Sequence, residues 1–161
     1  MVRLMIVGAA GRMGREVIRA AAASADLAVA SAVEHGAHPD LGKDAGAGAG
    51  LSALGVAIGS DLRAGLEASD AVIDFSLPES SARLFEALVS MPRPAVVGTT
   101  GLDDGAMKLA AQAAAKAPLI VSPNLSYGVA VLRQLTRSAA SLLGRFDVEV
   151  MEIHHRNKKD A

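Results

Sequence analysis

Residues 2–14 read V-R-L-M-I-V-G-A-A-G-R-M-G and predict a strand, a glycine turn and the start of a helix. The apolar run at 4–7 is the strand, and residues 15–20 continue with helical spacing. In such a turn Gly8 bends the backbone, Gly11 lets it approach a pyrophosphate, and Gly14 lets helix and strand pack closely. Three glycines also occur in turns that bind nothing, so the motif alone is weak evidence.

An acidic residue at a suitable distance strengthens the prediction. Residues 27–33 read as a second strand that ends at Glu34, twenty residues after Gly14. In dinucleotide-binding folds an acid at this point hydrogen-bonds the hydroxyls of the adenosine ribose. The glycine turn and Glu34 together therefore predict a dinucleotide-binding site.

Composition restricts the class of protein. The chain has 161 residues, no cysteine, a net charge of −1 and 2% aromatic residues. This length suits one domain, or one domain and part of another, and the lack of cysteine excludes disulfides and thiolate sites. The weak charge and the scarcity of aromatic rings argue against nucleic acid as a partner. The opening apolar run is too short to span a membrane, and we expect a cytoplasmic protein.

Strands and helices alternate as far as residue 121. Further strands are predicted at 71–75, 95–97 and 119–121. Helices are expected to start at Asp61, Pro78 and Asp103. The strands are continuously apolar, which predicts a Rossmann-type, doubly wound α/β fold with a parallel sheet buried on both faces. Residues 35–54, rich in glycine and alanine, are expected to form an irregular, mobile loop.

The pattern changes after Asn124. A helical stripe of apolar residues runs through 128–143, and residues 146–153 alternate imperfectly, which predicts a strand with one exposed face. We therefore predict a dinucleotide-binding domain at 1–126 and the beginning of a second, α+β substrate domain at 127–161. No later element would cover the last predicted strand, so we expect this sequence to be a fragment of a longer protein.

Polar clusters follow three of the predicted strands. They are residues 74–76, 98–101 and 122–126. Taken singly, each cluster is an ordinary turn sequence. In open α/β sheets, however, ligands bind outside the carboxyl ends of the strands. The three clusters, the glycine turn and Glu34 therefore predict one site at that edge.

A second candidate site lies at residues 152–160, which read E-I-H-H-R-N-K-K-D. One interpretation is a solvated basic tail. Adjacent histidines could also hold a metal, but with no cysteine and no second pair of adjacent histidines the ligand set is incomplete, and we predict no metal site. The functional interpretation is a site for a small polyanion, in which guanidinium and imidazole groups bind carboxylates and a crowded ammonium donates a proton.

Five motifs resemble those of the dihydrodipicolinate reductase family: G-A-A-G-R-M-G at 8–14, I-D-F-S-L-P-E at 73–79, V-G-T-T-G at 97–101, P-N-L-S-Y-G-V at 123–129 and E-I-H-H-R-N-K-K-D-A at 152–161. The resemblance covers the whole chain. It implies NAD(P)H-dependent reduction of 4-hydroxy-tetrahydrodipicolinate to tetrahydrodipicolinate, in the diaminopimelate and lysine pathway. It also implies a small dicarboxylate substrate, a homotetramer, and a sequence truncated after its histidine motif.

The resemblance implies roles for individual residues. The pyrophosphate would be held by Gly8, Ala9, Ala10, Gly11, Arg12 and Met13, and the adenosine ribose by Glu34 and His35. The nicotinamide half would contact Gly98, Thr99, Thr100, Ser122, Pro123, Asn124 and Leu125. His154 matches the family's proton donor/acceptor, and Lys158 matches its proton donor. His155 matches a contact to a substrate carboxylate. The sequence departs from the family at two positions: His35 replaces an arginine found in some members, and Leu125 replaces a common aromatic.

The pair at 34 and 35 also predicts the preferred cofactor. The carboxylate of Glu34 would repel the 2′-phosphate of NADPH, and His35 carries only a fractional positive charge at neutral pH. NADH is therefore expected to bind better than NADPH. Two alternative functions remain, a catalytically inactive nucleotide-binding fragment and another Rossmann dehydrogenase acting on an amino or hydroxy acid. The histidine motif argues against the second.

Overall fold

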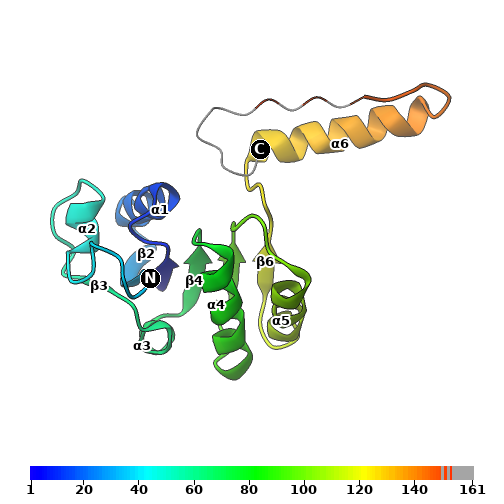
Figure 1. Cartoon of the computed structure of the whole chain (residues 1–161). Coiled ribbons are helices and arrows are strands. Elements are labelled where there is room, and N and C mark those ends of the chain that lie inside the picture. The colour runs from blue at the N-terminus through cyan, green and yellow to red at the C-terminus, as the bar shows by residue number, and fades with distance from the viewer. Residues whose placement is uncertain (150, 152, 154–161) are drawn as a thin grey trace. The chain divides into compact units, whose positions relative to one another are not determined.

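The computed structural model describes residues 1–149, 151 and 153. The chain divides into two compact units, Met1–Ser122 and Pro123–Ala161. The first unit is built on a six-stranded sheet, and the described part of the second contains one helix, α6 (Tyr127–Leu142) (Figure 1).

All strands of the sheet are parallel, and their order is β3-β2-β1-β4-β5-β6. They are β1 (Val2–Val7), β2 (Leu27–Val33), β3 (Ile58–Gly59), β4 (Ala71–Asp74), β5 (Ala95–Val97) and β6 (Leu119–Val121). The order reverses between β1 and β4, as in a doubly wound dinucleotide-binding sheet. The predicted Rossmann-type α/β fold is confirmed.

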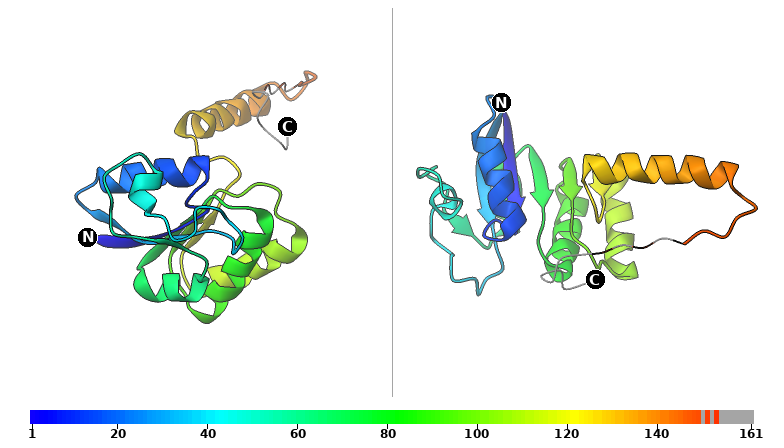
Figure 2. Two further views of the ribbon diagram at one scale, coloured as in Figure 1. Left: turned by 60° about the vertical axis from the view of Figure 1, so that its left-hand side comes forward. Right: turned by 90° about the horizontal axis from the view of Figure 1, so that it is seen from above.

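Helices cover both faces of this sheet. Those of the first unit are α1 (Arg12–Ala22), α2 (Ala45–Gly48), α3 (Leu62–Ala68), α4 (Pro78–Ser90) and α5 (Asp104–Ala114). Buried residues of α1 and α2 share one apolar cluster with β1 and β2, and those of α3, α4 and α5 share the other. Figure 2 shows α1 on the opposite side of the sheet from α4 and α5.

Apolar residues in β1 are buried on both faces, as the continuous run predicts. Met5 and Val7 pack in the cluster of α4, whereas Ile6 packs in the cluster of α1. Coverage is less complete at the edge of the sheet, where Ile120 of β6 is 56% exposed. The prediction of burial on both faces therefore holds for the central strand and is wrong for β6.

Three helices begin where the sequence predicts. The Asp61 carboxylate accepts hydrogen bonds from the backbone N–H groups of Arg63 and Ala64 and caps α3. Pro78 is the first residue of α4, and the Asp103 carboxylate caps α5. Such residues satisfy or remove N–H groups that have no acceptor inside the helix.

Residues 35–54 are more regular than predicted. They contain α2, and the Asp44 carboxylate accepts hydrogen bonds of 2.8–3.1 Å from four backbone N–H groups, those of Ala47, Leu54, Gly55 and Val56. These N–H groups, that of Ala47 most strongly, hold the pKa of Asp44 below its usual value. One carboxylate thus closes the loop, and the prediction of an irregular segment holds outside α2 but misses this short helix.

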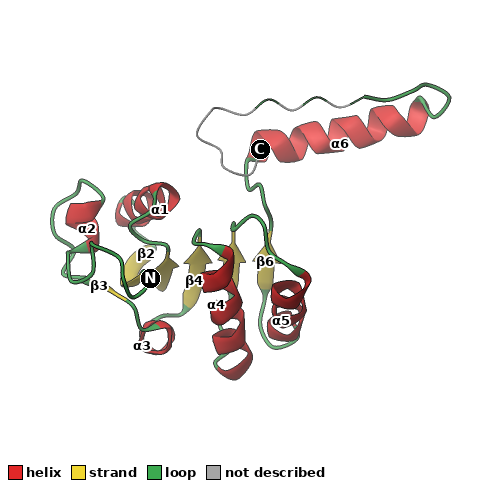
Figure 3. Cartoon of the chain, in the orientation of Figure 1, coloured by secondary structure: helices red, strands yellow, loops and turns green. Residues whose placement is uncertain are grey.

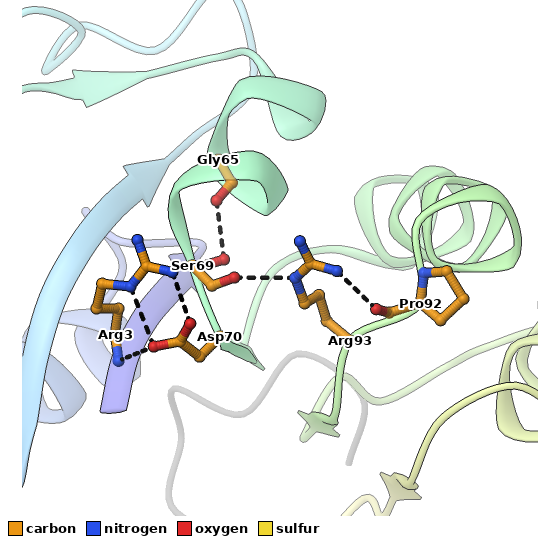
Figure 4. Close-up of polar contacts among 6 residues, drawn as sticks. All are labelled: Arg3, Gly65, Ser69, Asp70, Pro92 and Arg93. Carbon is orange, nitrogen blue, oxygen red and sulfur yellow. Dashed lines mark hydrogen bonds and ion pairs between the residues drawn. The ribbon is translucent and has the colours of Figure 1, made fainter. Parts of the chain in front are cut away.

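Polar contacts join the strands at the edge opposite the candidate site (Figure 4). The Arg3 guanidinium and backbone N–H donate to the Asp70 carboxylate at 2.7–3.1 Å, and these bonds lower the pKa of Asp70 to about 2. Arg93 donates to the carbonyl of Ser69 at 2.9 Å. These contacts join the amino ends of β1 and β4, so they support the sheet and lie away from the site.

The second unit confirms one prediction and corrects another. The helix predicted at 128–143 is α6, capped by Ser126. The strand predicted at 146–153 is absent from the described residues of that segment, which form a turn and irregular chain (Figure 3). Strand backbone groups need a partner, and within the described chain no strand pairs with this segment. No described helix combines the length and apolarity needed to cross a membrane.

Candidate functional site

The carboxyl ends of β1 and β4 meet where the strand order reverses. Val7 ends β1, Asp74 ends β4, and the two residues pair in register. In open α/β sheets this switch point is where ligands bind. A cleft opens at this edge, with a volume of about 60 Å³. Its lining residues are Val7, Gly8, Val33, Glu34, His35, Gly36, Ser60, Leu62, Ser76, Ser80 and Arg83.

Two glycines of the turn after β1 are required by packing. Gly8 has a φ of +75°, and a Cβ there would lie 2.8 Å from the carbonyl oxygen of Phe75. A Cβ at Gly14 would lie 2.1 Å from the carbonyl oxygen of Gly8. The predicted roles of Gly8 in the turn and of Gly14 in helix–strand packing are therefore confirmed.

Gly11 differs from the other two glycines because it is exposed. It is the N-cap of α1, and a Cβ there would meet only the carbonyl oxygen of Gly8, at 3.1 Å. No side chain caps this helix, and its first turn contains no acidic residue. The N-terminus of α1 therefore has the free N–H groups and positive dipole end that bind anions.

Most backbone N–H groups of the turn already have acceptors in the protein. Those of Gly8 and Ala9 donate to the carbonyl of Val33, and that of Gly11 donates to Gly8. The N–H of Ala10 donates to the Glu34 carboxylate. Because the first N–H groups of a helix have no acceptor within it, those at positions 12 and 13 remain for a ligand. Residues 8–11 thus shape the turn, and Arg12 and Met13 offer the donors.

Glu34 lies beside the glycine turn, immediately after β2. Its Oε1 accepts the hydrogen bond from Ala10 at 2.9 Å, and the side chain is half-buried. Its other carboxylate oxygen has no hydrogen-bond partner among the described residues. One oxygen therefore fixes the carboxylate against the turn, and the second can accept a hydrogen bond from a ligand.

The cleft also contains polar residues that the sequence analysis missed. Ser80 and Arg83 come from α4, and Ser60 follows β3. Arg83 is exposed and has no ion-pair partner in the described part of the chain. Ser80 and Arg83 are three residues apart on a helix and so share a face. This spacing identifies the two residues as part of the site only when the strand order is known, because that order places α4 near the end of β1.

A buried polar network lies at the ends of β4 and β5. The Ser81 hydroxyl is 2.6 Å from the Asp74 carboxylate and 2.8 Å from the Thr99 hydroxyl, and the N–H of Ser76 donates to Asp74 at 2.8 Å. Asp74 and Ser81 are fully buried. Burial raises the pKa of Asp74, although its hydrogen bonds act in the opposite direction. The network joins β4, α4 and the segment after β5.

Gly98 and Thr99, predicted to lie near the nicotinamide, have structural contacts of their own. A Cβ at Gly98 would lie 2.2 Å from a ring carbon of Phe75, so only glycine leaves room for this ring. Thr99 is buried and bonded to Ser81, whereas Thr100 is half-buried. Contacts between these residues and a cofactor stay predictions.

The remaining predicted site residues lie in or next to the second unit. Ser122 ends the first unit, and its N–H donates to the carbonyl of Val97 at 3.0 Å. Pro123, Asn124 and Leu125 are exposed residues of the second unit. The predicted catalytic and substrate-binding residues His154, His155 and Lys158 lie outside the described residues.

Comparison with known proteins identifies relatives along the whole chain. Residues 2–125 match the family model of the dihydrodipicolinate reductase N-terminus, and residues 128–161 match that of the C-terminus. A 4-hydroxy-tetrahydrodipicolinate reductase of Anaeromyxobacter dehalogenans (strain 2CP-1 / ATCC BAA-258) is 45% identical over 162 residues, covering 100% of this chain and 60% of the relative. One from Citrifermentans bemidjiense is 42% identical and covers 100% of this chain and 61% of the relative.

A solved structure shares the fold. It is described as "Dipicolinate bound Dihydrodipicolinate reductase from Paenisporosarcina sp. TG-14", with a TM-score of 0.71 and 21% identity over 88% of this chain and 54% of that one. The present chain spans about 60% of the length of the curated relatives it matches. Because both family models match and together cover nearly all of the sequence, the chain belongs to the dihydrodipicolinate reductase family.

Proposed function

We propose that this chain is the NAD(P)H-binding part, and the start of the substrate part, of a reductase that converts 4-hydroxy-tetrahydrodipicolinate to tetrahydrodipicolinate. The observation that carries the proposal is the alignment of this whole chain with 60% of a reductase of that name. The proposed dinucleotide-binding domain comprises residues 1–126, and residues 127–161 begin a domain for the dicarboxylate substrate and for assembly into a homotetramer. The glycine turn and Glu34, which meet at one edge of the sheet, support this assignment.

The described residues suit the binding of a dinucleotide. The N–H groups of Arg12 and Met13 would hold the pyrophosphate at the N-terminus of α1. The free carboxylate oxygen of Glu34 would accept hydrogen bonds from the hydroxyls of the adenosine ribose. When bound, NADH or NADPH supplies the hydride that reduces the substrate. The Asp74–Ser81 contact holds β4 and α4 together at this edge.

Proton transfer is proposed for the histidine motif. By resemblance to the family, His154 and Lys158 supply protons, and His155 binds a substrate carboxylate. General acids contribute about 10²–10⁴-fold to rate. In the intact reductase, Lys158→Ala should lower kcat by that factor and leave the Kd for NADH unchanged, while the neighbouring Lys159→Ala should change neither. Equal kcat values for Lys158→Ala and wild type would remove Lys158 from the mechanism.

We also propose that NADH is preferred over NADPH. Glu34 would stand close to a 2′-phosphate, and two like charges about 4 Å apart repel by roughly 1–4 kcal/mol at effective dielectric constants of 80 to 20. His35 replaces an arginine, which would bind a phosphate with a permanent charge and a bidentate grip. Arg83 lines the same cleft, so its charge would reduce the preference without abolishing it.

Calorimetric titration of the chain with NADH and NADPH tests both cofactor binding and preference. Glu34→Gln keeps an oxygen for the Ala10 N–H but replaces the free carboxylate oxygen with an NH₂ group, which removes both the charge and the proposed ribose acceptor, so NADPH should gain affinity relative to NADH by about tenfold or more. Arg83→Gln should weaken NADPH more than NADH, and His35→Arg should strengthen NADPH. Failure of wild type to bind either cofactor would contradict the proposed function, and an unchanged affinity ratio in Glu34→Gln would contradict the role of its charge.

A further inference from the structure

We propose that Glu34, His35 and His38 bind a divalent transition-metal ion of the Zn²⁺ class, and that the bound metal prevents the dinucleotide from using Glu34. The first part stands on the three side chains alone, and the second rests on the proposed function. Each of the three residues offers one ligand atom, and these atoms lie within 4.8 Å of one another. Two imidazoles and a carboxylate form a known set of zinc ligands.

The backbone holds the two histidines together. His38 donates its N–H to the carbonyl of His35 at 2.9 Å, which closes a turn between them. Their ring centroids are 5.3 Å apart, and the ring planes are inclined by 77°. The rings are therefore near one another without being stacked, and rotation of the exposed His35 side chain can bring a nitrogen of each to a common point.

Glu34 supplies the third ligand from a fixed position. Its Oε1 is bonded to the N–H of Ala10, which leaves the second oxygen for a metal. For zinc bond lengths of 2.0–2.2 Å, tetrahedral ligand atoms stand roughly 3.4 Å apart. The ligand atoms of the three residues now lie up to 4.8 Å apart, so they must move closer together to bind zinc. His35 can make this movement because its side chain is exposed.

The surrounding groups permit a metal ion and limit its affinity. One nitrogen of His38, Nδ1, accepts a hydrogen bond of 3.1 Å from the N–H of Asp40, so binding through Nε2 would give up that bond. The Asp40 carboxylate is paired with Arg15 and Lys43. Arg83, in the same cleft as Glu34 and His35, opposes a cation. The proposed site therefore binds the metal reversibly, and another ligand can compete with the metal for it.

Competition follows from the single free oxygen of Glu34. A metal on that oxygen removes the acceptor proposed for the adenosine ribose, and a ribose there removes the third metal ligand. By reciprocity, each ligand weakens the other by the same factor. The metal would therefore inhibit cofactor binding.

Zinc titration of the metal-free chain tests the site directly. The chain is stripped with EDTA, dialysed and titrated with ZnCl₂ by calorimetry, with wild type compared with His35→Gln and with His38→Gln. Each variant should weaken zinc binding by more than tenfold, since even outer-shell changes cost about 10–100-fold. The double variant His154→Gln/His155→Gln is the control for the other histidine pair and should retain the site. Unchanged zinc affinity in both single variants, or loss of the site in the control, would overturn the proposal.

A second titration tests competition. Saturating ZnCl₂ should raise the Kd for NADH in wild type by at least tenfold, and in His38→Gln it should have little effect. His38 does not line the cleft, and a thermal melt shows whether its variant is folded. Equal NADH affinity with and without zinc in wild type would refute the competition. If the chain binds no NADH, the proposed function fails, while the zinc titration still decides whether the metal site exists.

Discussion

The glycines at 11 and 14 give a paired test of what the turn after β1 does. A Cβ added at Gly14 would lie 2.1 Å from the carbonyl oxygen of Gly8 and 2.8 Å from the Cα of Ala9. Non-bonded heavy atoms normally lie about 3.5 Å apart, and both neighbours are backbone, so α1 would have to move by about 1 Å. Such overpacking costs about 1–3 kcal/mol. For a chain of this size that lowers Tm by roughly 2–12 °C.

A side chain at Gly11 should affect binding and leave the fold intact. Gly11 has φ −69° and ψ 167°, an extended conformation that valine adopts readily, and a Cβ there would meet one carbonyl oxygen at 3.1 Å. Gly11→Val should melt within a few degrees of wild type and lose NADH affinity by more than tenfold, because its side chain would stand at the proposed pyrophosphate site.

Urea and thermal unfolding of both variants, with calorimetry for NADH, provide the measurements. Gly14→Ala should unfold early, and Gly11→Val should be folded and empty of cofactor. Wild-type stability of Gly14→Ala would refute the packing argument. Wild-type NADH affinity of Gly11→Val would show that the turn is structural only.

Three further predictions concern buried and paired carboxylates. Burial raises the pKa of Asp74, so its contribution to stability is fully present below pH 3.8 and is lost as the pH rises through the pKa in the folded state. Asp74→Asn should therefore be at least as stable as wild type at pH 7, and its free energy of unfolding in urea should vary less with pH. Ser81→Ala removes the hydroxyl shared by Asp74 and Thr99 and should lower the free energy of unfolding by about 1–3 kcal/mol in the same assay. Arg3 holds the pKa of Asp70 at about 2, so the stability that this ion pair contributes is lost as the pH falls from 3.8 towards 2. Asp70→Asn should remove this part of the acid sensitivity, which thermal melts at several pH values would measure.

The main elements of the first unit were predictable because their signals are local. Apolar runs mark β1 and β4, and Asp61, Pro78 and Asp103 mark the starts of helices at the positions the structure shows. The two-residue β3 and the four-residue α2 each span only about one hydrophobic period, so neither can show a repeating pattern. β3 is defined by its pairing with β2, and α2 is capped by Asp44, which also bonds backbone groups up to 12 residues away; no local pattern records such contacts.

The candidate site was predictable to a similar extent. Gly8, Gly14 and Glu34 belong to a motif with fixed spacing, and the structure brings them together. Arg83 enters the cleft through strand order, because α4 follows β4 and β4 lies next to β1. His38 was overlooked for a different reason. It is three residues away from His35, the nearest histidine along the chain, and the turn between them brings the rings together.

The two oxygens of Glu34 link the fold to its proposed function. The oxygen that accepts the Ala10 N–H ties the end of β2 to the turn after β1, and the N–H groups of Gly8, Ala9 and Gly11 are satisfied within the protein as well. The turn is therefore held in shape before any ligand arrives, and its remaining donors at the start of α1 need no rearrangement to receive one. Preorganisation of this kind lowers the entropy cost of binding. Removing the whole Glu34 side chain would disturb the turn and the proposed ligand contact together, whereas Glu34→Gln separates the two roles, because the amide keeps an oxygen for the Ala10 N–H and loses the free carboxylate oxygen and the charge.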